Sequence, residues 1–302
     1  MINKTTKDRI EKLHMAYCAL SEDCREAFDE ISMAEIPESV YNSNAIENST
    51  LSLEDTEDIL VRNEIRKDHD IREIYEAKNL AEVMEMLRGY VQKGKNISTP
   101  KVMLELHKTL LTGIDNGIAG RFRSGKEWVR VGAHIGANPA FTNELVYELA
   151  EKFNADKDAY FLDKIAHFHA EFETIHPFVD GNGRIGRVLV NGQLMQLGYP
   201  PIIIPNKGKH RDYYILFDDY RKGGRFDGFT RLFALLLMES MHKRLTIARS
   251  KRIASVSEWA KAGGLNPRNA LNMARKQTIP AFRLRGKWMI DVAYVVGSTY
   301  VL

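Results

Sequence analysis

The sequence of 302 residues is 44% hydrophobic, 27% charged and 9% aromatic, which is typical of a folded globular protein and excludes a disordered or fibrous chain. Its length predicts one large domain or two unequal ones. The longest purely apolar run has six residues, Phe233 to Met238, whereas a bilayer-spanning helix needs about 20. The chain has only two cysteines and a charged N-terminus, so we expect a cytoplasmic protein without membrane contact.

Charge is unevenly distributed, although the net charge is only +3. Residues 249–302 contain ten basic and two acidic residues, whereas the remainder has 33 basic and 38 acidic residues. A basic segment on an acidic body suggests a separate module that binds nucleic acid or an acidic partner, but a solubilising surface would give the same pattern.

Apolar residues recur at spacings of three and four through most of the first 250 residues, which predicts a mainly α-helical protein. The predicted helices lie near residues 10–20, 74–87, 102–110, 145–153, 162–175, 183–197 and 227–245. The one clear β pattern is the alternation from Trp128 to Ile135, which predicts a hairpin over residues 126–136 with Gly132 at its bend.

A candidate domain boundary falls in the basic passage of residues 246–255. After it, the sequence predicts a helix from Ser257, a turn with Pro267, a helix over 269–276 and two strand-like runs, which is a winged-helix pattern. The predicted division is therefore an N-terminal helical region (1–95), a core (96–248) and a small winged-helix domain (249–302).

The segment HPFVDGNGRIGR, from His176 to Arg187, carries most of the chemical information. Gly181 and Gly183 allow the backbone to approach a ligand closely. A helix is predicted to begin there, so its free N–H groups form an anion site that suits phosphate. Arg184 and Arg187 lie three residues apart on one helix face, where both guanidinium groups can bind phosphate oxygens.

Two further residues of this segment complete a reactive set. A carboxylate among phosphates, here Asp180, is best explained as a ligand for Mg²⁺. His176 has the side-chain chemistry of a general base for a hydroxyl. A turn, ion-paired arginines and a loop histidine would explain any one of these residues, but the combination within twelve positions predicts nucleotidyl or phosphoryl transfer.

The segment resembles the signature HxFx(D/E)GNGRxxR of Fic proteins and matches every fixed position. The preceding HAEFETIHPF is similar to the lead-in helix of that family, and the resemblance covers about residues 35–245. It implies a helical Fic core with a small β-hairpin flap, and an enzyme that transfers AMP from ATP to a hydroxyl side chain of a target protein. Other family members transfer different phosphate-containing groups.

The resemblance implies a role for each residue of the segment. His176 would deprotonate a Ser, Thr or Tyr of the target protein, and Asp180 would hold Mg²⁺ on the phosphates. Arg184 would bind the leaving phosphates, and Arg187 the γ-phosphate. Tyr214 would lie at the adenine, or else belong to the core. The full expected ATP-binding set is Gly181, Asn182, Gly183, Arg184, Ile185, Gly186, Arg187 and Tyr214.

The hairpin of residues 126–136 resembles the flap with which the family holds the target main chain by strand addition. The expected docking residues are Trp128, Val129, Val131 and Ile135. An ordinary hydrophobic hairpin with Trp128 in the core is the alternative. The following segment, GANPAFTNE, lacks the proline-rich form common in relatives.

The hexapeptide SNAIEN resembles the inhibitory motif (S/T)xxxE(G/N) of the same family, with Ser43, Glu47 and Asn48 at its fixed positions. We expect the Glu47 carboxylate to form a bidentate pair with Arg187 and so occupy the position that the γ-phosphate needs. Some relatives use this glutamate to remove AMP from a modified target, a second activity that the sequence leaves open. Inhibited relatives often form homodimers, and we expect one here.

Residues 255–291 resemble excisionase-like winged-helix modules that bind DNA. The helix over 269–276 would then enter the major groove. The basic residues expected at DNA are Arg268, Arg275, Lys276, Arg283, Arg285 and Lys287. A protein-docking domain with Trp259 and Trp288 in its core is the alternative. Two functions are therefore open: an autoinhibited protein adenylyltransferase, or a DNA-binding regulator that senses nucleotide.

Overall fold

The computed structural model describes residues 2–297, which divide into two compact units. The larger unit contains residues 35–197 and 203–230, and the smaller unit contains residues 2–34, 198–202 and 231–297. Both units are discontinuous in sequence, whereas the predicted domains are contiguous. Across residues 2–297, no helix has the combined length and apolar character that crossing a membrane requires.

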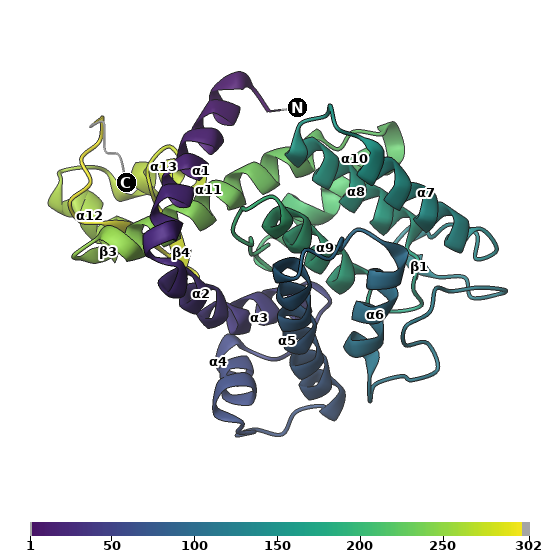
Figure 1. Ribbon diagram of the computed structural model, residues 1–302. Helices are drawn as coiled ribbons and strands as arrows, with labels where there is room; N and C mark the ends of the chain where they lie inside the picture. Colours follow the sequence, from purple (N-terminus) through teal and green to yellow (C-terminus); the bar gives the residue numbers. More distant parts are fainter. Residues whose placement is uncertain (1, 298–302) are drawn as a thin grey trace. The chain divides into compact units, whose positions relative to one another are not determined.

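The larger unit is built from helices packed around α9. Its elements are α3 (Ile36–Ile46), α4 (Leu53–Glu57), η1 (Asp58–Arg62), α5 (Ile71–Gln92), α6 (Pro100–Leu111), α7 (Thr142–Ala155), α8 (Phe161–Ile175), α9 (Asn182–Gln196), η2 (His210–Tyr214) and α10 (Ile215–Gly223). Helix α9 contacts α3, α5, α6 and α8 (Figure 1). Aliphatic and aromatic side chains such as Leu80, Leu106 and Phe172 fill the core between them. The mainly helical prediction is therefore confirmed.

The loop between α8 and α9 is set by two residues with left-handed backbone conformations. His176 has φ 54° and ends α8, and Gly181 has φ 78° and precedes α9. A Cβ at position 181 would lie 2.9 Å from the Leu110 Cδ2, so glycine is required both by the conformation and by the space. The helix predicted to begin near Gly183 begins one residue earlier, at Asn182.

The predicted hairpin is present but short. Strand β1 (Arg130–Val131) pairs antiparallel with β2 (His134–Ile135), and Gly132 has φ 60° at the bend. Trp128 is 56% exposed, so the alternative that placed it in the core is wrong.

The smaller unit combines long helices with a three-stranded sheet. It contains α1 (Lys4–Asp23), α2 (Arg25–Ala34), most of α11 (Asp227–Arg249), β3 (Ile253–Ser255), α12 (Val256–Ala262), α13 (Pro267–Arg275), β4 (Phe282–Leu284) and β5 (Lys287–Asp291). The sheet order is β3-β5-β4, with both pairs antiparallel. Trp259 is 8% exposed and packs with Ala270, Ala274 and Ile290. The assignment of the C-terminal segment to the winged-helix class stays a prediction.

Candidate active site

Asn182 holds the loop of residues 176–181 in shape. Its Oδ1 accepts a hydrogen bond from the Phe178 N–H at 2.7 Å, and its Nδ2 donates to the Phe178 carbonyl at 2.8 Å. The Asn182 side chain is buried, and its oxygen and nitrogen each form one of these bonds. The phosphate-binding role expected of Asn182 stays a prediction.

The start of α9 presents an anion-binding arrangement. The first intrahelical hydrogen bond joins the Ile185 N–H to the Gly181 carbonyl at 3.0 Å, so the N–H groups of residues 182–184 precede it. Next to them lie the guanidinium groups of Arg184 and Arg187, whose side chains are only 3% and 8% exposed. Free N–H groups, the helix dipole and two buried cations together favour a polyphosphate.

Ile185 and Gly186 contribute packing rather than ligand contacts. The Ile185 side chain is fully buried in the core. A Cβ at Gly186 would collide with the Glu173 Oε1 and would lie 3.2 Å from the His169 Cε1. Both residues therefore allow α9 to lie closely against α8, which sets the position of the two arginines.

His176 is held as a neutral imidazole beside this anion site. Burial lowers its pKa to about 4, so that it is unprotonated at neutral pH. Its Nδ1 lies 3.7 Å from the Glu173 Oε2, and burial raises the pKa of Glu173 to about 8. The contact thus joins two neutral groups rather than an ion pair. A neutral imidazole is the form that accepts a proton.

Arg123 anchors the chain around the histidine, and the sequence did not indicate it. Its Nε donates to the His176 carbonyl at 2.6 Å, and its Nη2 donates to the carbonyls of Ile175, at 2.8 Å, and Ala137. Arg123 thereby connects Ala137, which closely follows β2, to the end of α8. The Arg123 side chain is 1% exposed, so these carbonyls are its solvation shell.

His107 of α6 contacts the loop of residues 176–181 through a hydrogen bond and a ring contact. Its Nδ1 accepts from the Gly120 N–H at 3.0 Å, so its Nε2 carries the proton and donates to the Asp180 carbonyl at 3.0 Å. Its ring stacks on Phe178 with centroids 3.7 Å apart. Burial lowers the pKa of His107 to about 4, which keeps this tautomer neutral.

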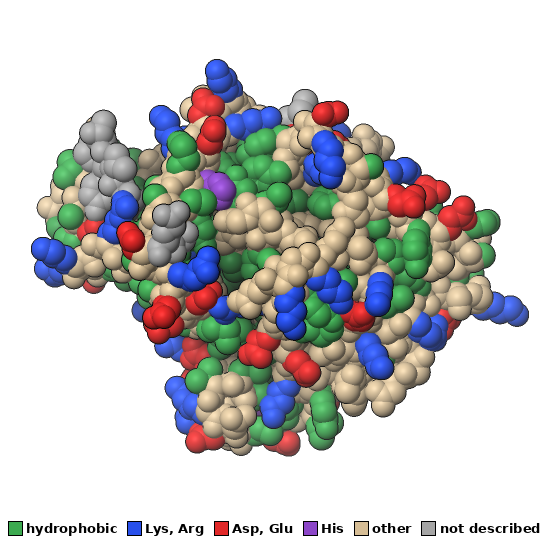
Figure 2. All heavy atoms as spheres, viewed as in Figure 1, with side chains coloured by type: hydrophobic (Ala, Val, Ile, Leu, Met, Phe, Trp, Pro, Cys, Tyr) green, Lys and Arg blue, Asp and Glu red, His purple; other side chains and the backbone are tan. Residues whose placement is uncertain are grey.

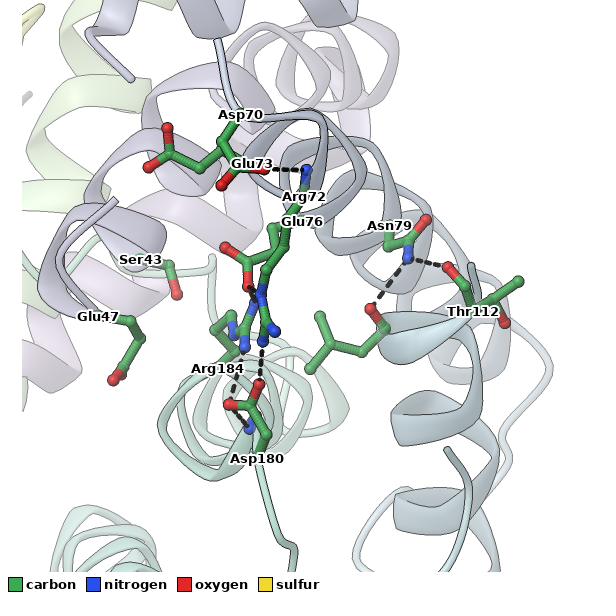
Figure 3. Close-up of polar contacts among 12 residues, drawn as sticks. Ser43, Glu47, Asp70, Arg72, Glu73, Glu76, Asn79, Thr112, Asp180 and Arg184 are labelled. Atoms are coloured by element: carbon green, nitrogen blue, oxygen red, sulfur yellow. Dashed lines mark hydrogen bonds and ion pairs between the residues drawn. The ribbon is translucent and has the colours of Figure 1, made fainter. Parts of the chain in front are cut away.

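Asp180 and Arg184 form a closed set of ion pairs with two residues of α5 (Figure 3). The Asp180 Oδ2 lies 2.6 Å from the Arg72 Nη2, and its Oδ1 lies 3.2 Å from the Arg184 Nη2. The Glu76 Oε1 lies 3.1 Å from both the Arg72 Nε and the Arg184 Nη1. Burial alone would raise the pKa of Asp180, but Arg184, the Gly181 N–H and Arg72 together lower it, so the carboxylate is ionised.

The residues present fit a magnesium ion that is shared with phosphate. Asp180 supplies an ionised oxygen donor that is 37% exposed. Within residues 2–297, three or more His, Cys, Asp or Glu side chains nowhere converge as a metal cluster. Mg²⁺ commonly takes one or two carboxylates and completes its shell with substrate phosphates and water, which matches this single carboxylate beside an anion site.

Arg187 contacts Ser43 of α3 and Glu47, the residue that follows this helix. Its Nη2 donates to the Glu47 Oε1 at 2.8 Å and to the Ser43 carbonyl at 2.9 Å, and its Nε donates to the Ser43 Oγ at 2.9 Å. Burial alone would lower the pKa of Arg187, but Glu47 raises it above its ordinary value. Glu47 thus makes a single hydrogen bond rather than the predicted bidentate pair, and Ser43 accepts the other two. The inhibitory role of Glu47 stays a prediction.

The adjacent residues Tyr213 and Tyr214 have different surroundings. Tyr213 is buried, and its hydroxyl lies 2.7 Å from the His169 Nε2. The Tyr214 hydroxyl donates to the Ile46 carbonyl at 2.5 Å, at the end of α3. Tyr214 therefore contacts the segment that carries Glu47, and a contact with adenine stays a prediction.

Lys209 holds the same end of α3, which the sequence did not indicate. Its Nζ donates to the carbonyls of Ala45 and Ile46 at 2.8 and 2.9 Å, and to the Asn48 Oδ1 at 2.8 Å. A cation at a helix C-terminus is favourable because it faces the negative end of the dipole. The Asn48 side chain thus contacts Lys209 at the end of α3.

The flap hairpin lies beside the histidine with an apolar, exposed surface. Trp128, Val131 and Ile135 are 56%, 45% and 49% exposed, and Val129 is half-buried. A Cβ at Gly136 would lie 3.1 Å from the His176 Cβ, so the end of the flap adjoins the catalytic candidate. The expected docking residues are therefore accessible close to His176.

A helical core that presents a histidine, a carboxylate and two arginines on a glycine loop at the start of a buried helix defines the class of Fic-fold proteins. Residues 97–194 match the model of the Fic/DOC family. The chain is 32% identical over 215 residues to the protein adenylyltransferase Fic of Drosophila mojavensis, covering 70% of this chain and 40% of that protein. It thus spans about two fifths of the length of this relative.

Solved structures give the same fold. A Fic domain containing signaling protein from Bacteroides thetaiotaomicron superposes with a TM-score of 0.71 at 24% identity, covering 80% of this chain and 96% of that one. Residues 134–508 of Fic-1 from C. elegans superpose with a TM-score of 0.67 at 26% identity, covering 81% and 71%. The chain belongs to the Fic/DOC family.

Proposed function

We propose that this protein transfers AMP from ATP to a hydroxyl group of a target protein, and that Glu47 restrains the transfer. The observation that carries the proposal is the convergence of a neutral His176, an ionised Asp180 and two buried arginines at the start of α9. The similarity to the protein adenylyltransferase Fic of Drosophila mojavensis supports this reaction.

The chain's own residues would act as follows. The imidazole of His176 accepts the proton of the target hydroxyl, whose oxygen attacks the α-phosphorus. The bond from that phosphorus to the bridging oxygen breaks, and pyrophosphate leaves. Arg184 and the N–H groups of residues 182–184 bind the departing charge, which lowers the barrier by electrostatic preorganisation. The exposed flap residues hold the target's main chain beside His176.

Asp180 would hold the magnesium ion, which supplies positive charge to the phosphate oxygens when bound. The side chain is already ionised by its neighbours and needs no proton release to bind a cation. A single carboxylate provides one fixed ligand and leaves the remaining ligands to phosphate and water.

The restraint would act through competition for Arg187. A carboxylate and a γ-phosphate cannot both bind the guanidinium face that Glu47 and Ser43 now occupy. ATP would then bind with its α-phosphate out of line, and a displacement of about 1 Å is enough to cost on the order of a hundredfold in rate. Removal of AMP by way of Glu47, and a homodimer, remain expectations from the family resemblance.

Mass spectrometry of the Glu47→Gly form after incubation with Mg-ATP tests the proposal. We expect a covalent AMP adduct on the enzyme itself and on proteins of a lysate, absent when Glu47→Gly is combined with His176→Ala. An adduct that persists without His176 would contradict the assigned base, and no adduct in either form would contradict AMP transfer.

We propose DNA binding by the smaller unit as a second function, supported by the surface of α13 and the adjacent hairpin. Arg268, Asn269, Asn272 and Arg275 are all exposed on α13, and this mixture of Arg and Asn suits base edges and phosphates. Arg285, in the turn between β4 and β5, is a further exposed cation of the same unit.

Arg283 does not share this role. Its Nε and Nη2 form a fork with the Glu239 carboxylate, both at 2.7 Å, and its guanidinium lies 5.2 Å from the Trp288 ring centroid. The side chain is thereby part of the fold, and the DNA role expected of Arg283 is withdrawn from the proposal.

Fluorescence anisotropy of the full chain with a labelled duplex tests the second function. We expect binding that weakens steeply as salt rises, because phosphate contacts release counterions. Binding should survive His176→Ala. Absence of any anisotropy change at low salt would contradict DNA binding.

A further inference from the structure

Four charged side chains at the edge of the site form a closed ring of alternating sign. Arg72 and Glu76 come from α5, and Asp180 and Arg184 flank the glycine loop (Figure 3). Each cation contacts both carboxylates, at distances between 2.6 and 3.2 Å. The ring is electrically neutral, and it contains the carboxylate and the guanidinium to which the proposed function assigns metal and phosphate binding.

The two halves of the ring differ in burial. The Arg184 and Glu76 side chains are 3% and 14% exposed, whereas those of Arg72 and Asp180 are 52% and 37% exposed. An exposed ion pair exchanges its partners readily, because water and other ions replace each of them at small free-energy cost. A buried pair does not, because breaking it strands a charge. The Arg72–Asp180 contact is therefore the ion pair of the ring that is most readily replaced by another ion.

We propose that Arg72 is a built-in substitute for the divalent cation on Asp180, and that it releases this carboxylate when metal-bound nucleotide enters. The inference rests on the proposed function, because it concerns the same nucleotide site. Arg72 acts as a regulatory residue here, since it sets how much metal the site requires rather than touching the reacting atoms.

Glu76 makes this exchange possible. It lies one helical turn from Arg72 on α5, with its Oε1 3.1 Å from the Arg72 Nε. When Arg72 leaves Asp180, it keeps a carboxylate partner and is not left as an isolated cation. In the absence of metal, Arg72 neutralises Asp180, whose charge would otherwise repel the phosphates of a nucleotide. We therefore expect Arg72 to favour nucleotide binding without metal and to oppose metal binding at Asp180 when metal is present.

Calorimetric titration of ADP into the full-length chain tests the inference. ADP lacks a γ-phosphate, so the Arg187–Glu47 contact does not enter the measurement. In Arg72→Gln, we expect the Mg²⁺ concentration for half-maximal gain in ADP affinity to fall about three- to fivefold, the range of an exposed ion pair. In EDTA, the same variant should bind ADP more weakly than the wild type, because Asp180 then keeps only Arg184 as a neighbouring cation.

Two further variants sharpen the result. Lys78→Gln removes the same charge from an exposed position on α5 and should leave both quantities unchanged. Glu76→Gln should raise the Mg²⁺ requirement, because Arg72 loses its alternative partner and holds Asp180 more firmly. Loss of ADP affinity by Arg72→Gln in both Mg²⁺ and EDTA would indicate a merely structural residue and overturn the inference.

The inference and the proposed function fail differently. ADP binding by the wild type with an unchanged Mg²⁺ requirement in Arg72→Gln would overturn the inference alone. A wild-type chain that binds no ADP at any Mg²⁺ concentration would overturn both.

Discussion

The signature loop of residues 176–187 and the basic segment of residues 249–297 both concentrate charge, but they hold it in different ways. In the loop, Arg184 and Arg187 are buried and each is paired with named carboxylates. In the basic segment, Arg268, Arg275 and Lys276 are exposed (the space-filling view in Figure 2 shows such surface cations in blue).

The difference determines how much chemistry each region specifies. Buried charges in fixed geometry interact strongly and define which groups are able to replace their partners. Exposed charges create a field that salt screens within about 8 Å at physiological ionic strength. We therefore expect single substitutions to have large effects in the loop and small, additive effects in the basic segment.

The largest expected effect is at His176. His176→Ala in the Glu47→Gly background should lower AMP transfer by about 10²–10⁴-fold, the usual contribution of a general base. Labelling with ATP radioactive at its α-phosphate measures it. His14→Ala, which alters a histidine of α1 in the smaller unit, is the control and should retain activity. Comparable losses in both variants would remove the distinction between the loop and other regions.

Glu47→Gly comes next in size. Freeing Arg187 should raise AMP transfer by up to about a hundredfold, because the α-phosphate then reaches an in-line position. The same labelling assay measures it, with Glu54→Gly as a control that removes an exposed carboxylate from α4. Equal activity of wild type and Glu47→Gly would show that the Arg187–Glu47 pair does not control the site.

The pH dependence of AMP transfer is a smaller effect. Because burial lowers the pKa of His176 to about 4, the imidazole stays neutral as pH falls, and the activity of Glu47→Gly should be nearly constant from pH 7.5 to 6. A histidine with the ordinary pKa of about 6.5 would lose about fourfold over this range. A rate profile with an acid limb near pH 6.5 would show that the histidine is not desolvated as described.

Substitutions in the basic segment should have the smallest effects. Arg275→Gln should weaken DNA binding only a few-fold and reduce the dependence of log affinity on log salt by about one unit, as expected for one phosphate contact. Anisotropy titrations at several salt concentrations measure both. A loss above about a hundredfold would break the comparison, because it would reveal a precise contact rather than a field.

The sequence predicted what is local or periodic. The helical stripes located most helices because burial follows the 3.6-residue period. The contiguous signature placed His176, Asp180, Arg184 and Arg187 in one loop and helix start, and the short motif at residues 43–48 led to the Arg187–Glu47 contact. The π-helices η1 and η2 were not predicted, since one extra residue per turn leaves no periodic signal.

The supporting residues could not be predicted because they come from distant segments without a motif. Arg72 contacts Asp180 across 108 residues of sequence, and Lys209 contacts Ile46 across 163. Arg123 and His107 act on backbone carbonyls, which carry no side-chain identity to recognise. Such contacts follow only from the tertiary packing of α3, α5 and α6 around the loop.

Gly183 has a consequence for the proposed restraint by Glu47. A Cβ at this position would collide with the Glu47 Oε1 and lie 2.9 Å from the Arg187 Nη1. Glu47 therefore lies in space that a side chain at position 183 would fill, and a substitution there would displace it from Arg187. If nucleotide binds at the start of α9, as proposed, such a substitution would obstruct it as well, so we expect release of the proposed restraint from changes at Glu47 or Ser43 and not at this glycine.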